Sequence, residues 1–461
     1  MPIIKAYTLP HPPLAVSSVG RGKEKEISKT LAAMDEVAED IAKLAPDTII
    51  YITPHSVLYS DYFHISPGSD AVGDLGRFGC PSVRFETKYD TELIDEISRI
   101  AELNEISAGT QGEREASLDH GVTVPMWFVN KSYKDYSSVR VAQSGMASSE
   151  HYLLGQIIAK AVESVGRRAV VIASSDLSHK LAHDGPYGYA PEGPEFDAVF
   201  TDALAKGDFL SLLKIDADLR ERASECGYNS LMILAGCFDK QDVEAKLLSY
   251  EGPFGVGYAV ASFLPVGKNE DRNLLEQYVE HALGESEKRK NTEDGHQTLA
   301  RRSLEHIIQT GQELPVPKGL TDELLKERAG VFVSIHKNGK LRGCVGTILP
   351  TTSSVAAEII QNAVSAGLAD NRFPPVGASE LPFLVYKVDV LKAPEPISGP
   401  EQLDVKRYGV IVTSGAKRGL LLPNLDGVDT IEDQIDIAAR KAGIRDGEVV
   451  ALQRFEVIRH E

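Results

Sequence analysis

The chain has 461 residues, which is long enough for two or three domains, each with its own core. Hydrophobic residues make up 42% and charged residues 25%, the composition of a globular protein and not of a disordered or fibrous chain. With 49 basic and 67 acidic side chains, the formal net charge is -18, which repels phosphate backbones and anionic lipid surfaces. We therefore expect neither a nucleic-acid nor a membrane partner.

The sequence patterns predict neither an apolar leader nor a membrane span. Its start, MPIIKAYTLPHPP, lacks a long apolar stretch, and no run approaches the roughly 18 apolar residues that a span requires. The four cysteines include no CxxC pair and are too scattered for a disulfide scaffold or a structural zinc site. These features predict a cytoplasmic protein with reduced thiols.

The first half of the chain alternates between strand-like and helix-like patterns. Apolar runs at 3–9 and 48–53 predict buried strands, and apolar side chains at steps of three and four between 27 and 44 predict a helix. Further strands are predicted at 138–144, 168–175, 243–252 and 257–266, with helices at 151–165, 194–206 and 227–239. Strand–helix–strand units of this kind build parallel sheets. We predict an α/β domain at 1–267, with a mostly parallel sheet and flanking helices.

The second half begins after a charged stretch. Residues 284–296 carry almost no apolar side chain, which predicts a linker or an exposed helix end, and we assign 268–294 as the linker. The elements predicted beyond it are a helix at 297–311, a hairpin turning at Asn338-Gly339, a strand at 384–391, a strand pair within 409–423, a helix at 430–442 and a closing strand at 449–458. Together they predict an α+β domain at 295–461.

Polar side chains follow the ends of the predicted parallel strands. His11 and His55 come just past the first two strands, and the strand at 168–175 runs directly into Asp176 and His179. Parallel sheets bind ligands beyond the carboxyl ends of their strands. Two histidines and one carboxylate bind Fe(II) and leave positions open for a substrate and dioxygen. His11 and His55 are therefore the first two predicted metal ligands.

The third ligand is harder to assign. Glu225 opens a predicted helix among small and apolar residues and is our choice, with Cys226 beside it as the alternative. A neutral imidazole suits acid–base work at pH 7, which makes His120 and His179 catalytic candidates, and we add Asp176 as a third. Zinc or copper are alternatives to Fe(II). Each residue also has a plainer interpretation, as a hydrogen-bonded structural histidine or, for Glu225, as an acid at a helix start.

Four motifs of the first half occur in a recognisable order. They are His11-Pro12-Pro13, Thr53-Pro54-His55-Ser56, Leu118-Asp119-His120-Gly121 and Ser174-Ser175-Asp176-Leu177-Ser178-His179. Over about 1–266 the chain resembles the class III extradiol dioxygenases and the related Memo family. The resemblance implies Fe(II) held by His11, His55 and Glu225, with His179 as the acid–base residue and His120 as a substrate contact. At Asp176 and Cys226 the chain is more similar to the Memo branch than to the dioxygenases.

This resemblance implies ring-opening oxygenation of a catechol-like or other bidentate aromatic molecule. Two alternatives stay open. The first is a metal-binding scaffold that works with a radical SAM enzyme and has no oxygenase turnover of its own, which Asp176 and Cys226 favour. The second is a zinc hydrolase with the same ligands, because two histidines and a glutamate also suit zinc with a bound water. The sequence leaves the oligomeric state open, a homo-oligomer included.

The second half carries motifs of its own, LRGCVGT at 341–347, DNRFPPV at 370–376 and GLLLP at 419–423. They resemble the AMMECR-type domain, and the pairing is similar to the bacterial AmmeMemoRadiSam arrangement, which implies a radical SAM protein as partner. The chain lacks the CxxxCxxC motif of such a protein. Within the first motif, Cys344 lies beside Arg342 and is a candidate reactive thiol. The alternative is a small core residue in an alternating strand.

Overall fold

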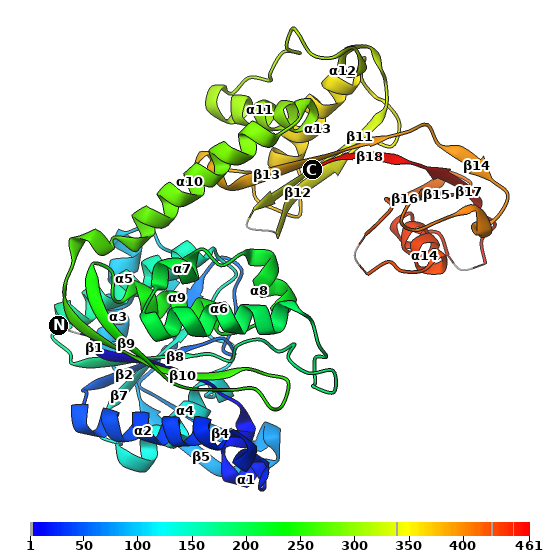
Figure 1. Cartoon of the computed structure of the whole chain (residues 1–461). Helices are drawn as coiled ribbons and strands as arrows, with labels where there is room; N and C mark the ends of the chain where they lie inside the picture. The colour runs from blue at the N-terminus through cyan, green and yellow to red at the C-terminus, as the bar shows by residue number, and fades with distance from the viewer. Residues whose placement is uncertain (1–2, 338–339, 426, 446) are drawn as a thin grey trace. The chain divides into compact units, whose positions relative to one another are not determined.

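The computed structural model describes residues 3–337, 340–425, 427–445 and 447–461. By internal contacts the chain divides into two compact units, Met1–Glu280 and His281–Glu461 (Figure 1). Within the described residues, no helix has the length and apolar character that crossing a membrane would demand.

The first unit is built on a six-stranded sheet in the order β7-β2-β8-β1-β10-β9. Its strands are β1 (Ile3–Leu9), β2 (Thr48–Thr53), β7 (Ser137–Ala142), β8 (Ala169–Ser174), β9 (Gln241–Glu251) and β10 (Tyr258–Lys268). The pairs β7–β2, β2–β8 and β8–β1 are parallel, whereas β10 runs antiparallel to both β1 and β9. Every residue of β2 and β8 is buried, as expected for strands covered on both faces.

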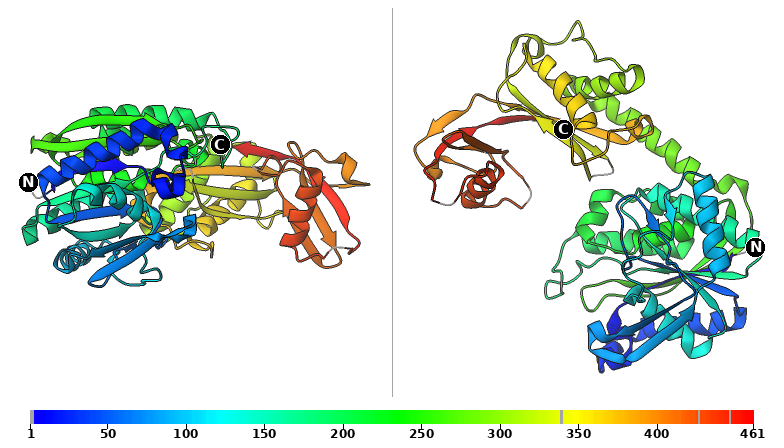
Figure 2. Two further views of the ribbon diagram at one scale, coloured as in Figure 1. Left: turned by 90° about the horizontal axis from the view of Figure 1, so that it is seen from below. Right: turned by 180° about the vertical axis from the view of Figure 1, so that it is seen from behind.

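Helices cover both faces of this sheet (Figures 1 and 2). They are α1 (Ser17–Gly20), α2 (Ser28–Leu44), α3 (Thr91–Leu103), α4 (His120–Ser132), α5 (Ser148–Val165), α6 (Glu192–Lys206), α7 (Phe209–Leu213), α8 (Ala217–Ala223) and α9 (Tyr228–Gly236). Helices α2 and α4 lie on one face, and α5 and α9 on the other (Figure 1). One continuous core fills the space between these layers.

The segment between β2 and β7 holds elements for which we made no prediction from the sequence. They are two short strands, β3 (Phe63–His64) and β6 (Ala108–Gly109), and the hairpin of β4 (Asp70–Leu75) and β5 (Cys80–Lys88), besides α3 and α4. Helix α4 has no amphipathic sequence pattern, because its residues 121–126 are all buried and Pro125 lies inside it. This segment matters for the site because α4 begins at His120.

The second unit contains two antiparallel sheets. The first, in the order β12-β11-β13-β18, consists of β11 (Gly330–Lys337), β12 (Lys340–Gly346), β13 (Leu384–Leu391) and β18 (Val457–His460). The second, in the order β14-β17-β15-β16, consists of β14 (Glu395–Ile397), β15 (Gly409–Ser414), β16 (Lys417–Leu421) and β17 (Ala451–Phe455). The helices of this half are α11 (Gly295–Thr310), α12 (Asp322–Lys326), α13 (Val355–Leu368) and α14 (Ile431–Lys441).

The predicted fold class is confirmed: a parallel-rich α/β domain precedes an α+β domain. The single closing strand predicted at 449–458 is wrong, because β17 and β18 belong to different sheets and Glu456 separates them. The charged stretch is helical, since α10 (Leu274–Thr292) runs through it with ion pairs such as Lys288–Glu285 and Lys290–Glu287. The predicted turn at Asn338-Gly339 lies outside the described residues.

Candidate metal centre

Two histidines meet beyond the carboxyl ends of β1 and β2. Strand β8 lies between these strands in the sheet, so their ends open on the same edge. His11 follows β1 and is 1% exposed, and its Nε2 lies 3.0 Å from Nε2 of His55, which follows β2. Two imidazole nitrogens facing each other at this distance suit a shared metal ion, because one tautomer of each ring leaves a lone pair on Nε2.

Cys226 completes the group. One ligand atom from each of His11, His55 and Cys226 lies within 4.8 Å of the other two, and the Cys226 Sγ is 3.6 Å from Nε2 of His11. Gly227 permits this approach, since a Cβ there would lie 1.8 Å from Oγ of Ser175 at the end of β8. The side-chain amide of Gln143 also donates a hydrogen bond to the Cys226 carbonyl at 2.9 Å.

Glu225, our choice from the sequence, lies outside this group of ligand atoms. Its Oε2 accepts a hydrogen bond of 2.7 Å from the backbone N–H of Tyr228, the first residue of α9. The carboxylate therefore accepts a hydrogen bond from a backbone N–H group that has no partner within the helix. Of the two residues considered for the third ligand, the structure brings Cys226 to the histidines.

The His11 ring is held from behind by a serine. Its Nδ1 lies 2.8 Å from Oγ of Ser174, the last residue of β8. Donation from Nδ1–H to this hydroxyl leaves the lone pair of His11 on Nε2, the nitrogen that faces His55 and Cys226. The donor set and its support thus fit a metal ion.

His120 lies against the same pair of histidines. Its ring stacks on that of His55 with centroids 4.1 Å apart and lies 5.4 Å from that of His11. The start of α4 reaches this position because Gly121 passes Thr53, whose Oγ1 would be 2.3 Å from a Cβ on the glycine. The Thr53 hydroxyl donates to Asp119, immediately before the helix, at 2.6 Å.

Asp176 and His179 follow β8 and also lie near the histidines. Asp176 accepts a hydrogen bond of 2.8 Å from the His11 backbone N–H, and its second oxygen lies 3.7 Å from His11 Nε2. The ring of His179 stacks on Tyr187 at 4.9 Å and is close enough to His11 and His55 to affect their pKa values.

Burial keeps this cluster neutral. It lowers the pKa of His11 well below its usual value, and it lowers the pKa values of His55 and His120 to about 4, while the pKa of His179 also falls. Burial raises the pKa of the Cys226 thiol, so binding a metal there would release the thiol proton. It also raises the pKa of Asp176 to about 7, against the hydrogen bond from His11.

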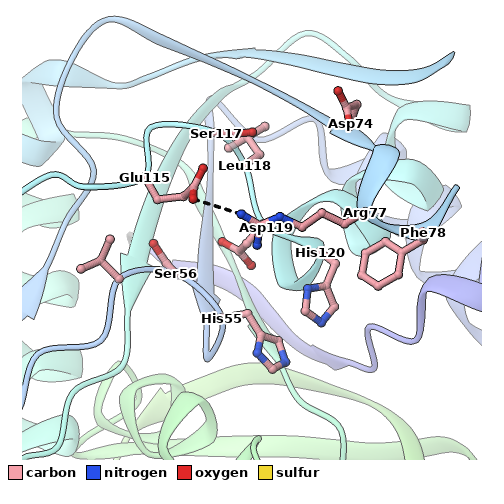
Figure 3. Close-up of a pocket in the computed structure, with 11 residues that line it drawn as sticks. His55, Ser56, Asp74, Arg77, Phe78, Glu115, Ser117, Leu118, Asp119 and His120 are labelled. Atoms are coloured by element: carbon pink, nitrogen blue, oxygen red, sulfur yellow. Dashed lines mark hydrogen bonds and ion pairs between the residues drawn. The ribbon is translucent and has the colours of Figure 1, made fainter. Parts of the chain in front are cut away.

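A cavity of about 350 Å³ opens beside the histidines, a size that accommodates a small molecule. Figure 3 shows His55 and His120 together in its wall, with Phe78 and Arg77 next to His120. Arg77 forms an ion pair with Glu115 across the cavity at 3.1 Å. Sequence patterns do not reveal Arg77 and Phe78, because these residues lie in the hairpin between β4 and β5, where no strand is predicted.

Cys344, the candidate reactive thiol, lies on β12 in the second unit. The backbone of this residue donates to Asp370 at 2.9 Å, and its Sγ accepts a hydrogen bond of 3.2 Å from Ser334. The neighbouring guanidiniums are already paired, Arg342 with Glu380 and Arg372 with Asp370. Among the described residues, Cys344 does not belong to a group of three or more side chains whose ligand atoms could hold a metal ion.

Comparison with known proteins assigns a family to each half. Residues 5–261 match the model for the catalytic LigB subunit of aromatic ring-opening dioxygenase, and residues 297–460 match that for AMMECR1. A protein of Clostridium acetobutylicum is 41% identical over 463 residues, which cover 99% of this chain and 98% of that protein. One of Thermotoga maritima is 47% identical over 162 residues, or 35% of this chain and 93% of that protein.

Among solved structures, an uncharacterized protein from Pyrococcus horikoshii has 32% sequence identity and a TM-score of 0.34, covering 36% of this chain and 88% of its own. The LigB match spans more than half of the chain and contains His11 and His55 after their strands and Cys226 before α9. The chain therefore belongs to the LigB family of aromatic ring-opening dioxygenases, with an AMMECR1 domain following the LigB domain.

Proposed function

We propose that the first unit is a metal-dependent oxygenase domain that opens the ring of a small bidentate aromatic substrate. One observation carries the proposal: His11 and His55 face each other at the sheet edge, and His55 also lines a cavity together with His120. The family match supplies the reaction class. Fe(II), the metal that this reaction requires, would activate the phenolate and bring dioxygen next to it.

The chain's own residues would bind the substrate and handle its protons. His120 lies in the cavity wall, and although burial lowers its pKa to about 4, its neutral imidazole would accept the proton of a phenol made more acidic by the bound metal. Phe78 lines the same cavity, with its ring centroid 5.3 Å from that of His120 in an edge-to-face arrangement, and an aromatic side chain in the wall suits a flat substrate. His179, which lies near enough to His11 to affect its pKa, is the second acid–base candidate.

A second candidate function rests on Cys226. Thiolate and imidazole together suit zinc and copper better than they suit Fe(II), whose oxygenase sites use a carboxylate. On this alternative, the domain holds a metal ion without dioxygenase turnover and works as a component beside a radical SAM enzyme. The LigB-type fold would then be retained for the metal site alone.

The two functions differ in metal content and in oxygen uptake. We would purify the full chain anaerobically, measure its metals by mass spectrometry, load it with Fe(II), zinc or copper, and follow dioxygen uptake with a panel of catechols. Uptake that matches the appearance of a ring-opened chromophore, and its loss in His120→Gln, support the oxygenase. Tight metal binding without uptake for any metal contradicts it and supports the component.

The third ligand is tested by two neighbouring substitutions. Cys226→Ser removes the thiolate and is expected to release most of the metal of the first unit. Glu225→Gln keeps an oxygen that can accept the Tyr228 N–H bond and is expected to retain the metal. The opposite result, with metal kept in Cys226→Ser and lost in Glu225→Gln, would return the assignment to Glu225.

A further inference from the structure

A second group of metal-ligand atoms lies in the second unit, apart from the site described above. It consists of Asp294, His296 and His460, and one ligand atom from each lies within 4.8 Å of the others. All three residues belong to the unit His281–Glu461. We refer to these three residues as the 294/296/460 cluster.

The backbone holds each member of the cluster in place. Asp294 is the N-cap of α11, and its Oδ1 accepts the backbone N–H groups of His296 at 2.8 Å and Gln297 at 3.0 Å. Its other oxygen lies 2.5 Å from Nδ1 of His460. His460 ends β18 and pairs with Val388 of β13, so the sheet fixes the position of its ring.

The His296 side chain is buried, the His460 side chain is 14% exposed, and both rings are incompletely hydrogen-bonded. Their rings stack with centroids 3.7 Å apart and planes at 18°. His296 is 6% exposed, and in the described part of the chain neither its Nε2 nor that of His460 has a hydrogen-bond partner. The Nδ1 of His296 lies 3.9 Å from the Asp294 carboxylate. A buried polar atom without a partner costs roughly 1–3 kcal/mol, so its presence calls for an explanation.

We propose that the 294/296/460 cluster is a metal site for a divalent ion of the zinc type. Two imidazoles and one carboxylate are a common donor set for zinc and leave a fourth position for water. Calcium and magnesium prefer sites made of oxygen ligands, so two imidazoles disfavour them. The Asp294 side chain is 43% exposed, which leaves the ion a route from solvent.

Such an ion would tie the last strand of the unit to the start of its first complete helix. Asp294 and His296 lie at the N-terminus of α11, whereas His460 comes from β18, more than 160 positions later in the sequence. Metal that binds the folded unit and not the unfolded chain stabilises the fold by mass action. The site would therefore make the stability of the second unit depend on zinc.

The test uses the full chain and removes the first centre, so that the two sites cannot be confused. We would load a His55→Ala protein with zinc, remove free metal by gel filtration and measure bound zinc by mass spectrometry. We expect one equivalent to remain, to disappear when His296→Gln is added, and to persist with His306→Gln, which changes another histidine of α11. Equal zinc in the His296→Gln and His306→Gln proteins would overturn the proposal.

A folding control accompanies this measurement. Circular dichroism and thermal unfolding in EDTA show whether the His296→Gln protein folds like the His306→Gln protein. With folding equal, added zinc should raise the unfolding temperature of the second unit in His306→Gln and leave it unchanged in His296→Gln. Cobalt(II) in place of zinc should give visible absorption bands that only the His306→Gln protein shows. If the two proteins respond alike to zinc and to cobalt(II), the cluster binds no metal and is only a hydrogen-bonded contact between histidine and aspartate.

Discussion

The two groups of metal-ligand atoms use similar side chains and are built differently. In the first unit, His11, His55 and Cys226 come from three chain segments that meet at one edge of a sheet, around buried strands. In the second unit, Asp294 and His296 are neighbours at a helix start, and only His460 comes from far along the chain. The first group has a cavity beside it, and the second has an exposed carboxylate.

This difference separates two uses of a metal site. At the sheet edge the fold supplies the position of each ligand, so losing the metal should leave the first unit folded and affect its chemistry. At the start of α11 the aspartate caps the helix and also contacts His460, so ligand binding and local stability are coupled. Removing a side chain that holds a ligand in the first unit should therefore change metal binding with little effect on local folding, whereas loss of the helix cap in the second unit should change both.

The largest effect is expected for Gly227→Ala. The new Cβ would collide with the side chain and backbone of Ser175, at 1.8 Å from Oγ and 2.7 Å from Cα, so the segment carrying Cys226 must move away from the histidines. Overpacking of this kind costs about 1–3 kcal/mol. We expect strongly reduced metal binding at the first centre, measured by metal analysis, and a lower unfolding temperature.

Gly267→Ala is the matched control, because a Cβ at this position in β10 meets no atom within 4 Å. It should retain the metal and the stability of the unmodified chain. Normal metal content in Gly227→Ala would mean that the close approach to Ser175 does not position Cys226.

A smaller effect is expected for Ser174→Ala, which removes the hydroxyl 2.8 Å from His11 Nδ1. Losing a contact that orients a ligand typically weakens metal affinity by about 10- to 100-fold. Competition with a chelator of known affinity measures the change. Ser175→Ala is the control, because its hydroxyl is buried without a hydrogen-bond partner among the described residues. Equal affinities for the two variants would contradict the role given to Ser174.

The smallest effect concerns Asp294, where capping and metal binding are separable. Asparagine is as good an N-cap as aspartate, whereas alanine costs about 1 kcal/mol at this position. In EDTA, urea unfolding should therefore show Asp294→Asn near the stability of the unmodified chain and Asp294→Ala below it. Neither variant should gain as much stability from zinc as the unmodified chain. Equal losses for both in EDTA would show that the cap is unimportant.

Sequence patterns are informative where burial repeats along the chain. The strands β1, β2 and β8 are recognisable as apolar runs, and these runs alone are enough to put His11, His55 and Asp176 at strand ends. Between β2 and β7 only α3 has a clear apolar period, whereas the strands of two residues and the helix without a polar face have none. The setting of His120 and the wall formed by Arg77 and Phe78 lie in this segment.

The choice between Glu225 and Cys226 shows what the sequence by itself leaves open. Both residues precede α9, and no pattern reveals which side chain faces the histidines. The structure places Cys226 there because Gly227 packs against Ser175, while the Glu225 carboxylate accepts a hydrogen bond from the Tyr228 N–H. The same limit holds for His296 and His460, since nothing local relates a helix start to a strand so far along the chain.

The sequence alone determined the two-domain order, the parallel-rich first sheet and the edge at which its histidines gather, because these follow from local periodicity and from the geometry of parallel strands. Only the tertiary structure decided which atoms meet at each cluster. Contacts between distant segments depend on close packing, such as that of Gly227 against Ser175, where even one added carbon atom would collide. No local pattern in the sequence encodes such contacts.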